Sequence, residues 1–163
     1  MPNWCVTDFT FVGSRKDIEV FKSVLDRYIA TSRVKNDFGD KWLGNIVICE
    51  GENHNKIHCR GEITYIEDIY EDPDNKENAI FELQTWTAWE PCFTVFNLVL
   101  RRFPSIKYYF YSEEPGGELY LTNDPEMNYF DLEQDRIDHG YLAFTEGERP
   151  TDDWKEEDLA CVN

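Results

Sequence analysis

The order of patterned segments along the chain limits the fold more than any other feature of this 163-residue sequence. Strand-like and helix-like stretches follow one another as β–α–β–β–α–β, and a further hairpin comes after them. Residues 4–12 are rich in β-branched and aromatic side chains, which favour a strand that ends at Gly13. Ser14 then suits a helix N-cap, and apolar residues recur at helical spacing from Ile18 to about Arg33.

The second half of the pattern begins after a stretch that is harder to assign. Residues 34–61 read as an insertion, in which "KWLGNIVI" suggests a short strand and "EGENHNK" a loop. Strand character resumes at 62–70, and residues 79–87 alternate cleanly between two faces. Pro91 suits the first turn of a second helix, continued by "CFTVFNLVLRRF", because this turn leaves its backbone N–H groups unpaired in any case.

A hairpin and an acidic segment complete the chain. Residues 106–114 and 118–124 read as two strands around a "PGG" turn, and "YLAF" suggests one more short strand. We therefore expect an α+β domain of ferredoxin-like type over residues 1–144. It has an antiparallel βαββαβ sheet, two helices on one face and an added C-terminal hairpin. The acidic segment 145–163, with Trp154 and Leu159 as its candidate anchors, is expected to be loosely held and dispensable for folding.

Composition argues against several functional classes. The net charge of −17, carried mainly by residues 50–82 and 124–163, repels phosphate backbones and argues against direct nucleic-acid binding. The sequence contains no run of about 18 apolar residues, which is the length needed to span a membrane. The opening "MPNWCVTD" lacks the basic flank and apolar core of a signal peptide. We expect a cytoplasmic protein. Its 5 cysteines are an odd set without CxxC spacing, and in a reducing compartment they are expected to be free thiols.

Short motifs spread along the chain resemble a known family. They are "MPNWC", "WLGN", "CRG", "TAWEP", "EEPG", "YLTND" and "YF". The motifs resemble uncharacterised proteins of gut bacteria and their phages, which are similar in turn to the YubB-like ferredoxin-domain family of plasmids and phages. The resemblance covers about residues 1–131 and departs from the YubB-like members at 34–61 and in the acidic tail. It implies the ferredoxin-like fold and a mobile-element origin, and it implies no activity and no catalytic residues.

Residues with reactive side chains form no recognisable catalytic or metal-binding pattern. "CEGENHNKIHC" brings Cys49, His54, His58 and Cys59 close in sequence, but its thiols are not paired as a zinc site requires. The cysteines lack a nucleophile signature, and the apolar helix around Cys92 favours packing. We expect no metal, no cofactor and no catalytic residue.

Aromatic residues supply the candidate site. If Phe81 and Leu83 face the helices, alternation turns the other set of side chains toward the open side of the sheet. Trp89, between the strand and Pro91, is expected to pack the joint of strand and helix. The candidate interaction surface consists of Trp86, Tyr109, Tyr111 and Tyr120, joined by Trp4.

A large aromatic patch on an acidic chain favours contact with a protein, either a second copy or another chain. We therefore expect a non-catalytic protein-interaction module of a bacterium or its mobile elements. Two alternatives stay open. Regularly spaced carboxylates along the surface would favour an acidic decoy that imitates nucleic acid and occupies a nucleic-acid-binding protein. A convergent pocket with a perturbed carboxylate would favour an enzyme with an unrecognised site.

Overall fold

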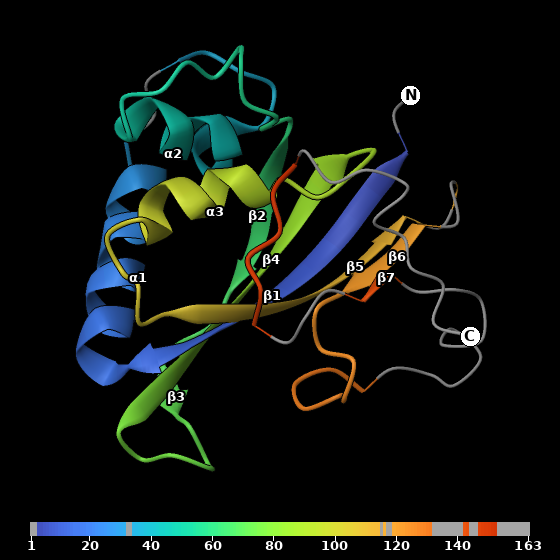
Figure 1. The fold of residues 1–163 in the computed structure, drawn as a ribbon. Coiled ribbons are helices and arrows are strands. Elements are labelled where there is room, and N and C mark those ends of the chain that lie inside the picture. The colour runs from blue at the N-terminus through green and yellow to red at the C-terminus, as the bar shows by residue number, and fades with distance from the viewer. Residues whose placement is uncertain are drawn as a thin grey trace.

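A β-sheet with helices on one side forms the frame of the molecule (Figure 1). The computed structural model describes residues 3–31, 34–114, 116, 119–131, 142–143 and 147–152. The strands in this part of the chain are β1 (Trp4–Ser14), β2 (Gly61–Ile66), β3 (Tyr70–Glu71), β4 (Asn78–Ala88), β5 (Lys107–Glu114), β6 (Leu119–Thr122) and β7 (Leu142–Ala143). The helices are α1 (Arg15–Ile29), the 3₁₀ turn η1 (Gly39–Lys41), α2 (Leu43–Cys49) and α3 (Phe93–Leu100).

Within the described residues the sheet has seven strands in the order β2-β4-β1-β5-β6-β7, and β3 pairs with β4 beside this path. Every pair is antiparallel except β6 and β7. Helix α1 connects β1 toward β2, and α3 connects β4 to β5. The expected α+β class with a largely antiparallel sheet is therefore confirmed, and so is the hairpin of β5 and β6.

The number of helices differs from the expected two, because the described residues contain three. "KWLGNIVI" contributes helix α2 instead of a strand. The Trp42 indole lies on Gly44, where an added Cβ would meet the ring at 2.2 Å. Leu43, Ile46 and Val47 are all buried. A short run that is apolar on every side fits a buried helix as well as a buried strand, so periodicity could not separate the two.

Segment boundaries also shift. Helix α1 starts where Ser14 predicts, since the Ser14 side chain accepts the Asp17 N–H at 3.2 Å, but it ends at Ile29 rather than Arg33. The single strand expected at 62–70 is two strands, β2 and β3, which both pair with β4. A bulge interrupts β2, because its register on β4 shifts between Ile63 and Tyr65.

The core lies between the sheet and the helices. Phe9 and Phe11 of β1 project toward this side, where Phe9 packs on Phe96 of α3 at 4.8 Å and Phe11 on Phe21 of α1 at 4.9 Å. All four rings are at most 1% exposed. Full burial of such a side chain contributes about 1.5–3 kcal/mol, so these rings fix which face of the sheet the helices cover.

Part of the acidic segment is packed against α3 rather than loosely held. The Asn97 side chain donates to the Pro150 carbonyl at 2.8 Å, and Pro150 is buried. The Arg149 guanidinium donates to the carbonyls of Leu100 and Phe103 at 3.1 Å and 3.0 Å, and to that of Ile106. Trp154 and Leu159 lie outside the described residues. None of the helices in the described part of the chain has the length and apolar character of a membrane span.

Candidate interaction surface

The sheet face opposite the helices, called here the open face, carries the aromatic residues singled out from the sequence. Phe9 pairs with Leu83 on one side and Phe110 on the other, and all three face the core. Alternation therefore turns the neighbouring positions to the open face. Those positions include Trp4, Trp86, Tyr109, Tyr111 and Tyr120.

These five residues do not form one exposed platform. Trp4 and Trp86 are 39% and 45% exposed, whereas Tyr109 is only 5% exposed. Tyr129 stacks on Tyr109 with ring centroids 4.3 Å apart. Phe130 lies 6.4 Å from Tyr111, which is half-buried, as is Tyr120. The chain itself thus covers the β5 side of the open face and Ile80 of β4, whereas Trp86 of β4 stays accessible.

The segment that covers Tyr109, residues 124–130, is called here the covering loop, and Figure 1 shows it on the side of the sheet away from the helices. Asp124, at 0% exposure, holds it in place. Its carboxylate accepts the backbone N–H groups of Asn128, Tyr129 and Phe130 at 3.0, 2.7 and 3.2 Å. Three N–H donors on one buried carboxylate fix the loop backbone, so both aromatic rings are set over the sheet.

The accessible part of the face ends at Trp4 and Trp86, and Trp89 follows directly after the last residue of β4. These three residues are called here the tryptophan end. Trp4 pairs with Ala88 in the sheet, and the Trp89 N–H donates to the Asn3 carbonyl at 2.9 Å. The expectation that Trp89 packs the strand–helix joint is wrong, because its side chain is 54% exposed. Its backbone adopts φ 76°, a left-handed conformation that costs free energy in a bulky residue.

A small cavity beside the covering loop has residues that the sequence analysis did not single out. It has a volume of about 210 Å³ and is called here the groove. Its lining includes Asp8, Thr10, Tyr65, Glu82, Tyr129 and Phe130. The bulge in β2 places one of these lining residues, Tyr65, on the open face. Ile63 pairs with Thr85 and faces the core, so regular alternation would turn Tyr65 to the core as well, but the extra residue turns it to the open face beside Gln84. One sequence signal was present, the charged Asp8 in the middle of an otherwise apolar and β-branched strand.

A second, larger cavity of about 400 Å³ lies between residues 34–38 and 54–60. Trp42 and His54 stand edge to face in its wall, 5.2 Å apart. Lys35, Asp37 and Arg60 also line it, so the charges on its walls are mixed.

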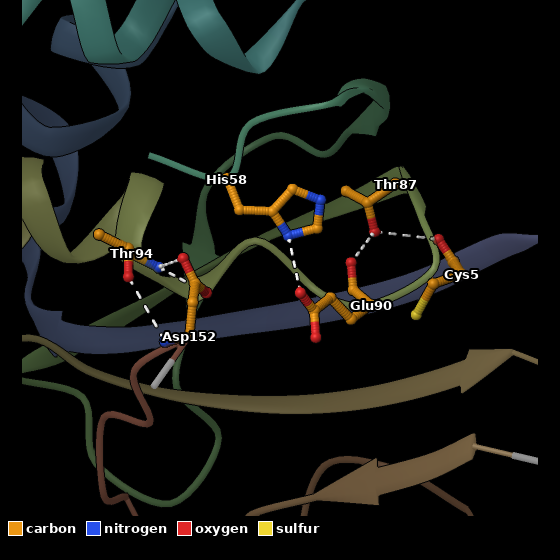
Figure 2. Close-up of polar contacts among 6 residues, drawn as sticks. All are labelled: Cys5, His58, Thr87, Glu90, Thr94 and Asp152. Carbon is orange, nitrogen blue, oxygen red and sulfur yellow. Dashed lines mark hydrogen bonds and ion pairs between the residues drawn. The ribbon is translucent and has the colours of Figure 1, made fainter. Parts of the chain in front are cut away.

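The histidine and carboxylates next to α3 form a polar cluster on the core side of the sheet (Figure 2). His58 Nδ1 lies 3.2 Å from Glu90 Oε1, an ion-pair distance. The Asp152 carboxylate accepts the Thr94 N–H at 3.2 Å, and the Asp152 N–H reaches the Thr94 hydroxyl at 3.4 Å. Cys92, at the N-cap position of α3, makes no side-chain cap, so Asp152 supplies the cap from a distant part of the chain. Burial raises the pKa of Asp152, and bonds to Thr94 lower it in part.

The described thiols near this cluster are poor nucleophiles. Cys5, Cys59 and Cys92 are at most 5% exposed. Burial raises the pKa of Cys5 and Cys92, and it raises that of Cys59 to about 11. Cys5 Sγ lies 3.1 Å from the Ser112 hydroxyl, and Cys59 Sγ donates to the His54 carbonyl at 3.5 Å. A thiol that stays protonated at neutral pH does not initiate attack, so these cysteines act as packing groups.

The side chains of the candidate metal ligands around residues 49–59 have different contacts. The His54 ring packs on Trp42, His58 faces Glu90, and the Cys59 thiol donates to the His54 backbone carbonyl. Cys49 belongs to α2. In the part of the chain that the structure describes, no group of three or more histidine, cysteine, aspartate or glutamate side chains is arranged to hold a metal ion.

Comparisons with protein-family models, with curated proteins and with solved structures found no match to this chain.

Proposed function

We propose that this chain is a non-catalytic interaction module that contacts a basic protein through the tryptophan end of its open face. The carrying observation is the exposure of three tryptophans at one end of the sheet: Trp4 at 39%, Trp86 at 45% and Trp89 at 54%. Tryptophan is enriched among residues that dominate protein–protein binding, and clustered exposed apolar side chains mark contact surfaces.

The fold proposed for this module is ferredoxin-like, in keeping with the resemblance to YubB-like proteins of mobile elements. Its support is the strand order β2-β4-β1-β5, with helices inserted after β1 and after β4. This is the arrangement of a split βαβ unit, in which two helices cover one face and leave the other free for contacts.

Charge favours a different protein over a second copy as the partner. Two copies would each carry a net charge of −17, and their repulsion opposes close contact. Acidic side chains also lie on the open face, among them Glu62 on β2 and Glu82 on β4. A partner with a positively charged contact surface complements them.

The test compares wild type with the double variant Trp86→Ala/Trp89→Ala and with Val20→Ala. Val20 is as exposed as Trp86, at 45%, but lies on α1, so it controls for the loss of an apolar surface group. Proteins captured from the native host by the immobilised wild type are identified by mass spectrometry, purified and titrated against all three chains. We expect the double variant to bind at least about 30-fold more weakly, as loss of a binding hot spot does. The control should bind like wild type.

Two outcomes would contradict this proposal. One is the absence of any selectively captured protein. The other is equal binding by the double variant and wild type. A nucleic-acid-binding protein that binds the double variant normally, and is released by moderate salt, would favour the acidic decoy instead.

A further inference from the structure

We propose that the groove binds the guanidinium group of an arginine carried by the basic partner. The inference rests on the proposed function, because it gives the chemistry of that partner at a neighbouring position of the same face. It assigns a ligand to Asp8 and Glu82, two residues that are not part of the tryptophan end.

The two carboxylates of the groove have no cationic partner in the described chain. Asp8 accepts a hydrogen bond from the Gln84 side chain at 2.9 Å. Glu82 accepts one from the Thr10 hydroxyl at 3.2 Å and also forms a side-chain hydrogen bond with Tyr70. All of these partners are neutral. None of the ion pairs between described residues includes Asp8 or Glu82. Burial raises the pKa of Asp8, as expected for a carboxylate that lacks a compensating positive charge.

The spacing of these carboxylates fits a forked cation. Asp8 pairs with Gln84 and Thr10 with Glu82, so the two carboxylates are diagonal neighbours on adjacent strands of the open face. Diagonal positions are roughly 7–8 Å apart between Cα atoms, close enough for one group to contact both side chains. Guanidinium carries five N–H donors in a planar fork and meets carboxylates with two hydrogen bonds at a time.

The walls of the groove are aromatic. Tyr65 stands on one side at 52% exposure, and Tyr129 and Phe130 stand on the other, on the loop fixed by Asp124. Guanidinium packs on aromatic faces and is more weakly hydrated than ammonium. A hard metal cation keeps oxygen ligands or water around it, which aromatic walls do not supply. Arginine therefore fits the lining better than lysine or a metal ion.

The size of the groove sets the size of its occupant. Its volume of about 210 Å³ is below the range of about 300–1,000 Å³ that small-molecule pockets occupy. One side-chain head group fits this volume. Trp86 lies four residues beyond Glu82 on the same strand and face, roughly 13 Å away at the rise of a β-strand. An extended partner segment with arginine in the groove would place a residue about four positions away against Trp86.

The test is a ¹H–¹⁵N NMR titration of the full chain with three probes: N-acetyl-arginine amide, N-acetyl-lysine amide and N-acetyl-citrulline amide. Citrulline has the shape of arginine without its charge. We expect saturable shifts of backbone amides around Asp8, Tyr65 and Glu82 with the arginine probe, and a Kd on the order of millimolar for so small a ligand. The lysine probe should bind at least about 5-fold more weakly, and the citrulline probe should not saturate.

Variants locate the site and separate this inference from the proposed function. Glu82→Gln and Asp8→Asn should each weaken the arginine probe at least about 10-fold, while Glu62→Gln, on the same face outside the groove, should not. Trp86→Ala should leave probe binding unchanged.

Equal binding of the lysine or citrulline probe, or equal loss with Glu62→Gln, would overturn the inference. Partner binding that needs Trp86 but tolerates Glu82→Gln would overturn it while the proposed function stands. If the arginine probe binds but no partner protein is captured, the inference about the groove stands and the proposed function is refuted.

Discussion

Asp124 and Asp152 are buried or partly buried carboxylates that each hold a segment in place, Asp124 within its own loop and Asp152 far along the chain. Asp124 fixes the covering loop through backbone N–H groups, and Asp152 caps α3 from a position 58 residues along the chain from Thr94. Both use charge-assisted bonds to backbone N–H groups, which are stronger than neutral ones. At the scale of single residues, the shape of this molecule depends on carboxylates whose partners are backbone atoms.

The variant Asp152→Asn tests the balance between this cap and the cost of its burial. The variant keeps an acceptor for the Thr94 N–H and removes the charge. Burial raises the pKa of Asp152 above 3.8, so the folded state binds the proton more tightly than the unfolded state. The contribution of this group to stability is then full below pH 3.8 and is lost as pH rises through the folded-state value. As pH rises through that value, we expect the free energy of unfolding of wild type to fall relative to that of Asp152→Asn.

Urea unfolding of both chains at a series of pH values measures this difference, and other titrating groups cancel in the comparison. Asp26→Asn, an exposed carboxylate on α1, controls for the general effect of removing one negative charge. A difference between wild type and Asp152→Asn that stays constant with pH would show that burial of the charge carries no net cost.

Single-residue features show how far the sequence could predict the structure. Alternation placed Tyr109 on the correct face, because the pairing of Phe9 and Phe110 across β1 and β5 follows from apolar residues alone. It could not predict that Tyr109 is covered, since Tyr129 reaches it through a loop that Asp124 folds. The groove was missed for the same reason: its walls come from a bulge and from this loop, and neither leaves a periodic signal.

At the scale of elements, α3 depends on a segment that follows it along the chain after three strands, β5, β6 and β7. Asp152 meets its first turn, and Arg149 meets carbonyls at and beyond its last turn. An eight-residue helix is short, and isolated helices of this length are not stable in water. Both ends of α3 are thus completed by one short stretch of the acidic tail, so composition alone was a poor guide to its role.

Arg149→Ala should destabilise the fold by about 2–3 kcal/mol, because it leaves partly buried carbonyls without their charged donor. Arg149→Lys should recover only part of this loss, since one ammonium cannot copy the fork that reaches Leu100, Phe103 and Ile106. Arg101→Ala removes an exposed ion pair with Glu52 and should cost at most about 1 kcal/mol. Chemical denaturation of the three variants gives these values. Equal losses in Arg149→Ala and Arg101→Ala would contradict the role given to Arg149.

At the scale of the whole molecule, we expect residues 147–152 and the β-sheet domain to unfold together. A chain ended at Phe144 loses Arg149, Pro150 and Asp152 together. We expect it to lose its cooperative thermal transition or to melt at least about 10 °C lower than wild type, since several kcal/mol are removed from a domain of this size. A chain ended after Asp152 retains every described contact of this stretch and is the matched comparison. Calorimetry on both chains decides the question, and an unchanged transition in the shorter one would mean that residues 148–152 only rest on the surface.

The bulge in β2 determines how the groove responds to a change in the length of this strand. One extra residue at Thr64 is what turns Tyr65 out of the core and into the wall of the groove. Deleting the codon of Thr64 would restore regular alternation with Ile63 on Thr85 and Tyr65 on Gln84, so the tyrosine would stay on the open face. Strands β1 and β4, which carry Asp8 and Glu82, would keep their pairing. Descendants of one ancestral gene could therefore differ by one residue in β2 and still keep the groove.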